Sequence, residues 1–560
     1  MTSNNSAAAP SANELMKAAH PTLDGTIAQT LARPDVDHFT EEDNQFLKFH
    51  GIYQQDDRDL RKTFKKYMLM VRVRIPGGIL APAQYLALDE LSTTYANNTL
   101  RITSRQAIQF HGIVKKNIVQ TIQGINQVLL TTLAACGDVT RNVMAPPSPA
   151  TDGVAEHIRE SARRLSKMLT PVTPAYHEIW LDGKELDLSK PTDTDFVDPL
   201  YGKAYLPRKF KIAFAVPPVN DVDVLTNCVG LIAIVEKGAL TGYDLTVGGG
   251  MGRSHNNPDT FPRVADLAGF ITPEQVDAAV HAVLTIHRDF GDRSNRKHAR
   301  LKYILADRGI EWFRGEFSKR AGFALQPARP YTFTRQGDSF GWQPQTNGKW
   351  YLGLFIETGR VRDNGPRRLK TAIRKIVEEF QTEVHLTPGN NMLLVNIPAQ
   401  EREPIAKILA EHGVPIENQG SALRRSSMAC VSLPTCGLGL AESERYLPGL
   451  ITRIEALLGE LGLADLEIIT RMTGCPNGCA RPYMAEIGFV GKAPGRYQLY
   501  LGGNEGGTRL NRLYKETVKD ADIVNDLRPL LVRFGKERMA GERFGDWAAR
   551  VLWNESAPAA

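Results

Sequence analysis

Two segments of this chain, 284 residues apart, share one pattern, and this internal repeat limits the possible folds more than any other feature. Residues 100–113 read LRITSRQAIQFHGI, and residues 384–397 read VHLTPGNNMLLVNI. In both, polar and apolar residues alternate as in half-buried strands, with a turn in the middle. An apolar run and then a helix-like segment precede each copy. Strand, turn, helix and strand therefore occur twice in the same order.

A second unit also occurs twice. Residues 141–147 read RNVMAPP and residues 426–434 read SSMACVSLP, and each leads into an amphipathic, helix-like stretch. Each copy then reaches a strand that ends in glycines, at 243–253 (YDLTVGGGMGR) and at 497–509 (YQLYLGGNEGGTR). The chain is thus predicted to be an A-B-A-B duplication of mixed α/β units. A duplicated protein has a pseudo-twofold seam, which is a natural place for a large cofactor.

Composition excludes several classes of protein. Hydrophobic residues make up 42% and charged residues 23%, and the formal net charge is +6. No apolar run approaches the roughly 18 residues needed to cross a bilayer, and the polar N-terminus lacks the pattern of a secretory signal. We expect a cytoplasmic protein with neither membrane nor nucleic acid as a partner. The mild positive charge suits an anionic substrate or an acidic partner protein.

The six cysteines are too few for a disulfide scaffold, so a reducing compartment is expected. Cys136 and Cys228 stand alone and are interpreted as small buried residues. The other four form two pairs, Cys430 with Cys436 and Cys475 with Cys479, spaced as C-x5-C, 38 residues, then C-x3-C. Four thiolates from two loops are the usual ligands of a [4Fe–4S] cluster. A zinc site is the alternative, although a five-residue gap is wide for one.

The motifs CVSLPTC (430–436) and TGCPNGC (473–479) resemble the signature of the siroheme-dependent sulfite and nitrite reductases. Further segments similar to that family span nearly the whole chain: FHGIYQQDDRDLR, LRITSRQAIQFHG, TRNVMAPP, YLPRKFKIAF, VGGGMGR and GCPNGCARPYMAEIGFVG. The resemblance implies a pseudo-symmetric fold with siroheme and a [4Fe–4S] cluster at the interface. It is strongest to the assimilatory sulfite reductases, which reduce sulfite to sulfide with six electrons.

The resemblance also implies a division of the chain. We expect a duplicated α/β (α+β) fold with mixed sheets and flanking helices. The expected segments are a polar, partly disordered leader (1–40), a ferredoxin-like half-unit (41–135), a siroheme- and substrate-binding unit (136–330), a second ferredoxin-like half-unit (331–400) and a second unit with the cluster cysteines (401–560).

In the family, the last motif cysteine bridges the cluster to the siroheme iron. By resemblance that residue is Cys479, while Cys430, Cys436 and Cys475 bind the cluster alone. A shared thiolate would give electrons a covalent path to the iron, whose other axial position stays open to substrate.

Siroheme carries eight carboxylates, so its pocket should be basic, and the fork of arginine matches carboxylate geometry. Arg101 and Arg105 lie in the first repeat, whereas the second copy has His385 and Gly389 at those places. Only one of the two pseudo-symmetric pockets is therefore expected to hold the haem. Surface salt bridges are the alternative role for the two arginines. The cofactor set implied by the resemblance also includes His111, Asn142, Arg208 and Gly249.

Four basic positions match the anion pocket of the family: Arg72, Arg141, Lys209 and Lys211. Lys209 and Lys211 are two residues apart, so on a strand they face the same side. Adjacent ammonium groups attract an anion and lower each other's pKa, which helps because each sulfite oxygen leaves as water after protonation. For any single lysine or arginine, a solvated surface charge is the alternative.

No G-x-G-x-x-G motif follows a predicted strand and opens a helix, so no nicotinamide or flavin domain is evident. Electrons are expected from a separate protein, either an NADPH-dependent flavoprotein subunit or a ferredoxin. Nitrite reduction to ammonia is the alternative activity in the same kind of pocket. A non-catalytic iron–sulfur or zinc protein on the same scaffold is the alternative outside the enzymes, and the four basic residues argue against it.

Overall fold

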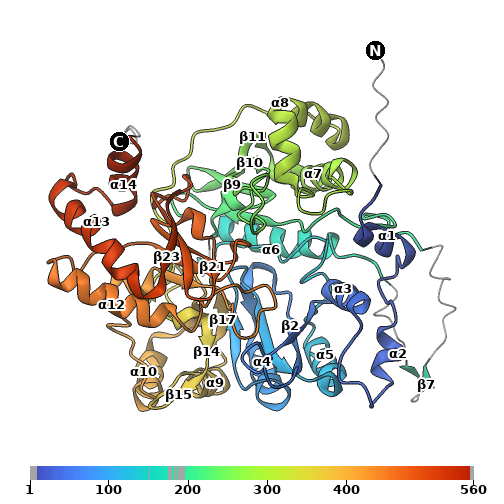
Figure 1. Cartoon of the computed structure of the whole chain (residues 1–560), viewed down its shortest axis with the longest axis horizontal. Helices are drawn as coiled ribbons and strands as arrows, with labels where there is room; N and C mark the ends of the chain where they lie inside the picture. Colours follow the sequence, from blue (N-terminus) through green and yellow to red (C-terminus); the bar gives the residue numbers. More distant parts are fainter. Residues whose placement is uncertain (1–8, 151, 174–179, 182–183, 186–195, 555–560) are drawn as a thin grey trace.

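The computed structural model of the chain describes residues 9–150, 152–173, 180–181, 184–185 and 196–554. Within these residues helices and strands build four large sheets, which form two related pairs (Figure 1). The mixed α/β class and the duplication predicted from the two repeats are confirmed by this arrangement.

The first pair consists of two antiparallel five-stranded sheets, one for each copy of the first repeat. The first sheet has the order β1 (Ile52–Asp56), β2 (Tyr67–Arg72), β5 (Ile108–Ile113), β4 (Leu100–Ile102), β14 (Arg360–Val361). The second has the order β12 (Gly341–Pro344), β13 (Trp350–Leu354), β18 (Met392–Ile397), β17 (Glu383–Leu386), β3 (Ile79–Leu80). The two orders correspond strand for strand.

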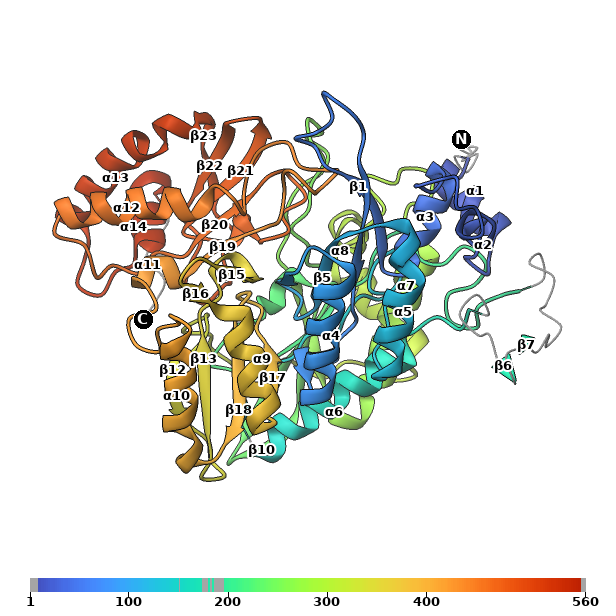
Figure 2. The ribbon, with the colours of Figure 1, turned by 90° about the horizontal axis from the view of Figure 1, so that it is seen from below.

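These two sheets exchange their outermost strands. The first sheet ends in β14, from the second half of the chain, and the second sheet ends in β3, from the first half. Helices α4 (Pro82–Tyr95) and α9 (Leu369–Phe380) pack against each other and share one core with both sheets (Figure 2). Asp89 of α4, which is fully buried, makes ion pairs of 3.1 Å with Lys370 and Arg374 of α9. The two half-units therefore form one body.

The second pair of sheets mixes parallel and antiparallel neighbours. One sheet has the order β11 (Asp266–Ile271), β10 (Ala239–Val247), β9 (Val229–Glu236), β8 (Ile212–Ala215). The other has the order β19 (Ser427–Ala429), β20 (Thr470–Thr473), β21 (Ile487–Ala493), β22 (Arg496–Leu501), β23 (Arg512–Lys519). Strand β8 is parallel to β9, and β20 is parallel to both β19 and β21. Apart from the edge strand β19, the two sheets again correspond, with β8, β9, β10 and β11 matching β20, β21, β22 and β23.

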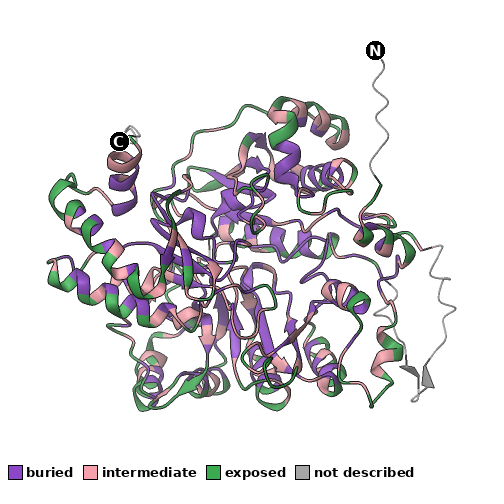
Figure 3. Ribbon diagram, viewed as in Figure 1, coloured by how far each residue is buried: buried purple, intermediate pink, exposed green. Residues whose placement is uncertain are grey.

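Helices cover the outer faces of these sheets and leave buried strands at the centre of the molecule (Figure 3). They are α6 (Gly153–Met168), α7 (Val276–Phe290) and α8 (Leu301–Ala321) on one sheet, and α12 (Leu447–Glu460), α13 (Ile523–Glu537) and α14 (Phe544–Trp553) on the other. Helix α6 begins where the side chain of Asp152 accepts a hydrogen bond from the Ala155 amide at 2.8 Å. Its apolar residues Ile158, Ala162 and Leu165 recur at helical spacing and are buried.

The remaining elements are short. The helices are α1 (Ala12–Ala19), α2 (Ile27–Leu31), α3 (Glu41–Phe49), α5 (Ile118–Gln127), α10 (Arg402–Glu411) and α11 (Ala422–Arg425). Two-stranded ribbons join β6 (Trp180–Leu181) to β7 (Lys184–Glu185) and β15 (Asp363–Asn364) to β16 (Arg367–Arg368). In the described part of the chain, no helix is long and apolar enough to cross a membrane. The predicted unit boundaries at 135, 330 and 400 stay predictions.

The N-terminal segment was expected to be a polar, partly disordered leader over residues 1–40, and this stays a prediction. From residue 9 onward it is described, and it contains α1 and α2. Lys17 of α1 is 1% exposed; its ammonium donates to the Leu206 carbonyl at 2.7 Å and pairs with Glu14 at 2.6 Å and Asp138 at 3.5 Å. The local composition of the segment is polar, but its charges are matched by residues far along the chain.

Candidate functional site

The two cysteine loops are brought together by neighbouring parallel strands. Cys430 directly follows β19, and Cys475 comes two residues after β20. Because parallel neighbours end at the same edge of a sheet, the loops leave that edge side by side. The Cys430 amide donates to the carbonyl of Met472, the third residue of β20, at 3.2 Å. The C-x5-C and C-x3-C motifs therefore meet in space.

Glycine allows the loops to approach closely. A side chain at Gly474 would overlap the hydroxyl of Ser432 in the other loop. With no side chain there, the Gly474 amide donates to Cys430 Sγ at 3.4 Å, and the Gly474 carbonyl accepts from Leu440 at 2.8 Å. Asn477 Nδ2 donates to Cys475 Sγ at 3.4 Å. The second loop thus directs donors at one sulfur of each loop.

The four thiols share one environment. Burial raises the pKa of Cys430, Cys436 and Cys475, that of Cys475 to about 12, and Cys479 lies close enough to add to each shift. Coordination to metal deprotonates a thiol outright, so a bound cluster would relieve this cost. The donor set fits an iron–sulfur cluster.

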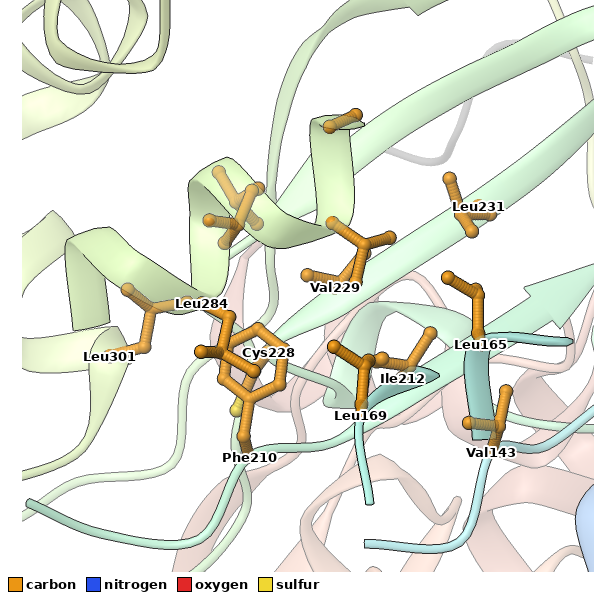
Figure 4. Close-up of a cluster of buried hydrophobic side chains, with 14 of the residues drawn as sticks. Val143, Leu165, Leu169, Phe210, Ile212, Cys228, Val229, Leu231, Leu284 and Leu301 are labelled. Carbon is orange, nitrogen blue, oxygen red and sulfur yellow. The ribbon is translucent and has the colours of Figure 1, made fainter. Parts of the chain in front are cut away.

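The two predicted pocket lysines face one side, as their spacing requires. Phe210 between them and Ile212 after them both point into the hydrophobic core (Figure 4). Lys209 and Lys211 must therefore point to the opposite side. Burial lowers the pKa of both, and nearby cations lower it further, while Cys479 acts in the opposite direction. The lysines and the exposed Cys479 thus belong to one site.

Arg72 and Arg141 join this site from two different units. Arg72, the last residue of β2, donates from Nη1 to Cys136 Sγ at 2.8 Å and to the Ala135 carbonyl at 3.5 Å. Arg141 donates from Nη1 to the same carbonyl at 3.4 Å and from Nε to the Gly137 carbonyl at 3.0 Å. The segment 135–137 therefore holds both guanidinium groups side by side. Cys136 is buried, as predicted, and its sulfur also positions Arg72.

Arg105 lies in the turn between β4 and β5. It donates from Nη1 to Asn227 Oδ1 at 2.9 Å and from Nη2 to the Ile212 carbonyl at 3.1 Å. Its Nε is buried without a partner among the described residues. Asn142 holds the turn in place by donating to the Arg105 carbonyl at 2.8 Å. A buried guanidinium with an unused donor fits a carboxylate of the expected cofactor.

Two other predicted cofactor residues lie next to the same region. Arg208 pairs with the buried carboxylate of Asp138 at 3.6 Å. Gly249 passes so close to the Leu225 carbonyl that a side chain would overlap it, and its amide donates to the Asn227 carbonyl at 2.8 Å. Asn227 therefore connects the glycine loop to Arg105.

Arg101 and His111 have a different environment. Each nitrogen of the Arg101 guanidinium already donates to protein, with Nε 3.1 Å from Glu444 and Nη2 2.7 Å from the Ala429 carbonyl. His111 Nδ1 accepts from Arg360 at 3.1 Å, and burial keeps its pKa well below the usual range. Glu444 also pairs with Arg360 at 2.7 Å. These residues form a buried ion-pair network rather than surface salt bridges, and the roles of Arg101 and His111 at the cofactor stay predictions.

The sequence reasoning missed two cations of the site, Arg300 and Lys302. Arg300 is 7% exposed, donates to Cys228 Sγ at 3.6 Å and contributes to the lowered pKa of both pocket lysines. Lys302 is fully buried and donates to the Gly252 carbonyl at 2.7 Å, which fixes the glycine loop. The segment RKHARLK was a usable signal, because it repeats the two-residue spacing of basic residues seen in RKFK.

Cations outnumber acids around the site. Neither lysine ammonium, on Lys209 or Lys211, pairs with a carboxylate anywhere in the described part of the chain. The buried carboxylate of Asp138, which pairs with Arg208, is already shared with Arg296 and Lys17. Uncompensated buried charge is costly, so such a group is built to receive anions. It fits both a polycarboxylate cofactor and a small oxyanion.

A separate cavity of about 510 Å³ lies away from the predicted site residues. Its lining includes Pro146, Pro217, Asp221, Arg335 and Asp338. Burial and the neighbouring Asp338 raise the pKa of Asp221 to about 8.

Comparison with known families identifies both types of unit. The family description "Nitrite/Sulfite reductase ferredoxin-like half domain" matches residues 63–128 and 343–412, the two copies of the first repeat. "Nitrite and sulphite reductase 4Fe-4S domain" matches residues 160–325, in the first copy of the second unit. That copy lacks the four motif cysteines, which lie in the second copy.

Individual relatives match the whole chain. The sulfite reductase [NADPH] hemoprotein beta-component of Staphylococcus saprophyticus is 49% identical, covering 96% of this chain and 95% of the relative. The protein of the same name from Lysinibacillus sphaericus is 48% identical, covering 97% and 95%. The solved structure of Mycobacterium tuberculosis NirA has a TM-score of 0.80 at 27% identity and covers 97% of this chain and 96% of its own. The chain therefore belongs to the nitrite and sulfite reductase family.

Proposed function

We propose that this protein is an assimilatory sulfite reductase hemoprotein, which reduces sulfite to sulfide with electrons from a separate protein. The observation that carries the proposal concerns Lys209 and Lys211, which form no ion pair with a carboxylate among the described residues. They lie next to Cys479 and the guanidinium groups of Arg72 and Arg141. Both relatives compared above are named sulfite reductases, which favours sulfite over nitrite. A scaffold that had lost its activity would have no reason to keep these four cations.

The side chains divide the work between holding and protonating the anion. Arg72 and Arg141, fixed by segment 135–137, would neutralise the sulfite oxygens. Lys209 and Lys211 have a lowered pKa, so each Nζ can release a proton near neutral pH more readily than an ordinary lysine. Each oxygen that leaves as water needs two protons, and these two ammonium groups are positioned to deliver them.

The cofactors are assigned to residues of the described site. Cys430, Cys436 and Cys475 would hold the [4Fe–4S] cluster, and Cys479 would bridge it to siroheme. When bound, the two groups would supply single electrons and an iron atom open to the anion. Arg105, through its unused Nε, and Arg208 would bind siroheme carboxylates. Asn142 and Gly249 would shape the pocket, while Arg101 and His111 would support it through the Glu444 network.

The electron donor needs a route to the cluster, and one loop reaches the surface there. Leu438, two residues after Cys436, is 62% exposed. The β1–β2 hairpin, whose tip is residues 57–66, stands beside this loop (Figure 2). Arg58 in the tip connects the two, because its amide donates to the Pro434 carbonyl at 3.1 Å and its Nη1 donates to the Gly439 carbonyl at 3.3 Å.

The same hairpin tip has the character of a docking surface for an acidic protein. Phe64 is 54% exposed, and Lys62 and Lys66 are exposed on either side of it. Exposed apolar residues within a basic rim are typical of electrostatically steered, short-lived complexes. The donor, either an NADPH-dependent flavoprotein subunit or a ferredoxin, would dock over Phe64 and Leu438.

The test is an optical and chemical analysis of the purified protein. A haem spectrum, about four non-haem irons per siroheme and dye-driven sulfite reduction are the expected results. Colourless protein with one bound zinc would overturn the proposal. Faster turnover of nitrite than of sulfite would instead favour the nitrite alternative.

A further inference from the structure

The two loops that follow β8 and β20 are counterparts in the duplication. Strand β8 pairs with β9 through Ile212 and Val229, and β20 pairs with β21 through Thr470 and Ile487. Both residues of the second pair lie 258 positions after those of the first, so the intervening loops are equal in length. The second loop contains Cys475 and Cys479, and the first contains no motif cysteine.

The same shift of 258 positions relates Asp223 to Arg481. Both have left-handed backbone conformations, with φ 47° and ψ 58° for Asp223 and φ 53° and ψ 50° for Arg481. Both precede a short 3₁₀ turn, η4 (Val224–Thr226) and η8 (Pro482–Met484). Such a conformation costs energy for residues other than glycine and persists only where the surroundings enforce it.

These two counterparts bind each other at the centre of the molecule. Arg481 donates from Nε to Asp223 Oδ2, and Arg471 donates to the same oxygen from Nη1 at 2.7 Å. Asp223 is fully buried, and the two arginines are 7% exposed or less. Guanidinium groups on both sides keep the pKa of Asp223 below its usual value despite burial. The pair therefore stays charged.

The remaining nitrogens of Arg481 contact both copies of the first repeat. Nη1 donates to the Ser104 carbonyl at 3.0 Å, and Nη2 donates to the Pro388 carbonyl at 3.1 Å. Ser104 and Pro388 are themselves counterparts, 284 positions apart, in the turns after β4 and β17. A single guanidinium thus connects four segments of the chain.

The chain of contacts ends at the bridging cysteine. Ser104 Oγ donates to the Cys479 carbonyl at 2.9 Å, and Arg105, the next residue, is a proposed siroheme ligand. We propose that Arg481, held by Asp223, is a positioning residue that fixes Cys479 relative to the turn carrying Arg105. This inference rests on the proposed role of Cys479 as the bridge between cluster and siroheme. Arg481 itself would touch no reacting atom.

Arg481→Lys tests the proposal, with Arg471→Lys as its matched control. Lysine keeps the charge next to Asp223 but cannot reach Asp223, Ser104 and Pro388 together. Arg471 shares the same carboxylate and is equally buried, but neither turn is among its hydrogen-bond partners, which are Asp223, Gln336 and the Arg481 carbonyl. The measurements are siroheme and iron content, the electron paramagnetic resonance signature of haem–cluster coupling, and dye-driven kinetics on the full chain with its cofactors.

With Arg481→Lys we expect normal cofactor content, altered coupling, a fall in kcat of at least about tenfold and a KM for sulfite within about twofold of the original. Arg471→Lys should change kcat less than about threefold. Ser104→Ala, which removes only the bond to the Cys479 carbonyl, should alter coupling in the same direction and covers the case in which Arg481→Lys does not fold.

Equal effects of the two lysine variants, or unchanged coupling in both Arg481→Lys and Ser104→Ala, would overturn the positioning role. That result is distinct from failure of the proposed function, which would show as absent siroheme or cluster in the unmodified protein.

Discussion

Replacing Lys211 with methionine should separate sulfite from nitrite. The change removes one cation and one proton donor from the face shared with Lys209 and leaves a side chain of similar length. The sulfite dianion carries two negative charges and nitrite carries one. We therefore expect kcat/KM to fall further with sulfite than with nitrite, because sulfite has more charge to neutralise and more oxygens to protonate.

The magnitude follows from Coulomb attraction reduced by desolvation. At an effective dielectric of 20 and a separation of about 4 Å, one pair of unit charges is worth roughly 4 kcal/mol. The second charge of sulfite adds one such interaction, but desolvating a dianion costs more, and Arg72, Arg141 and Lys209 remain. If about a third of the interaction survives, the excess loss is roughly 1.4 kcal/mol, or about tenfold in kcat/KM.

The assay is steady-state kinetics on both anions with a chemical electron donor, which bypasses the partner protein. Lys237→Met is the matched control, because Lys237 is exposed in the turn between β9 and β10 of the same sheet. This control variant should leave kcat/KM unchanged with both sulfite and nitrite. If sulfite and nitrite lose the same factor with Lys211→Met, or nitrite loses more, the charge argument for a sulfite pocket is wrong.

The other predictions concern the bridging thiol, the hairpin and the cavity. Cys479→Ser should abolish turnover and uncouple the haem from the cluster, whereas Cys228→Ser should keep its iron. Equal loss of iron in both variants would leave the assignment of Cys479 as the bridge between cluster and siroheme unsupported. Reversing the charges of Lys62 and Lys66 should raise the KM for a protein donor about tenfold and spare dye-driven turnover; a loss with both donors would argue against docking there. Asp221 has a pKa raised from 3.8 to about 8, so the folded state keeps a proton that the unfolded chain loses and stability falls as pH rises between those values. In thermal unfolding, Asp221→Asn should therefore stabilise the protein by roughly 1–3 kcal/mol at pH 8 and hardly at pH 4. An equal gain in stability at both pH values would contradict the raised pKa of Asp221.

Periodic patterns made the large elements predictable. The helix-like segments at 82–95 and 369–380 coincide with α4 and α9, because apolar residues at helical spacing mark both and proline at the first position also marks α4. The exchanged strands β3 and β14 were not predicted. Each of these strands has only two residues, which is too short to show an alternation of polar and apolar residues. The position of each strand is set by the sheet of the other half of the chain, with which it pairs.

The site was predictable where residue type alone decides the chemistry, as for the cysteines and the lysine pair. Arg101 shows the limit. Its partner Glu444 lies 343 positions later, and only the fold reveals that the guanidinium is already committed to it. Arg300 and Arg481 were missed for the same reason, because their importance comes from distant neighbours rather than from the residues beside them in the sequence.

The duplication also gives each motif cysteine a counterpart position in the other copy. Met144 makes a parallel bridge to Ala213, just as Met428 pairs in parallel with Arg471, so Pro146 is the counterpart of Cys430. The shift of 258 positions makes Pro217 and Asp221 the counterparts of Cys475 and Cys479. All three counterparts line the cavity of about 510 Å³. This cavity therefore lies at the position that corresponds, in the other copy, to the site of the motif cysteines.

The counterparts of the predicted basic pocket residues lie in the second half of the chain and include residues that are not basic. Gly389 is the counterpart of Arg105, and a side chain there would overlap the carboxylate of Asp338, which is held by Thr387 at 2.6 Å. Ile469 is the counterpart of Lys211. The proposed site thus takes its basic residues from the first half of the chain and its cysteines from the second, and the central contacts of Arg481 join the two halves.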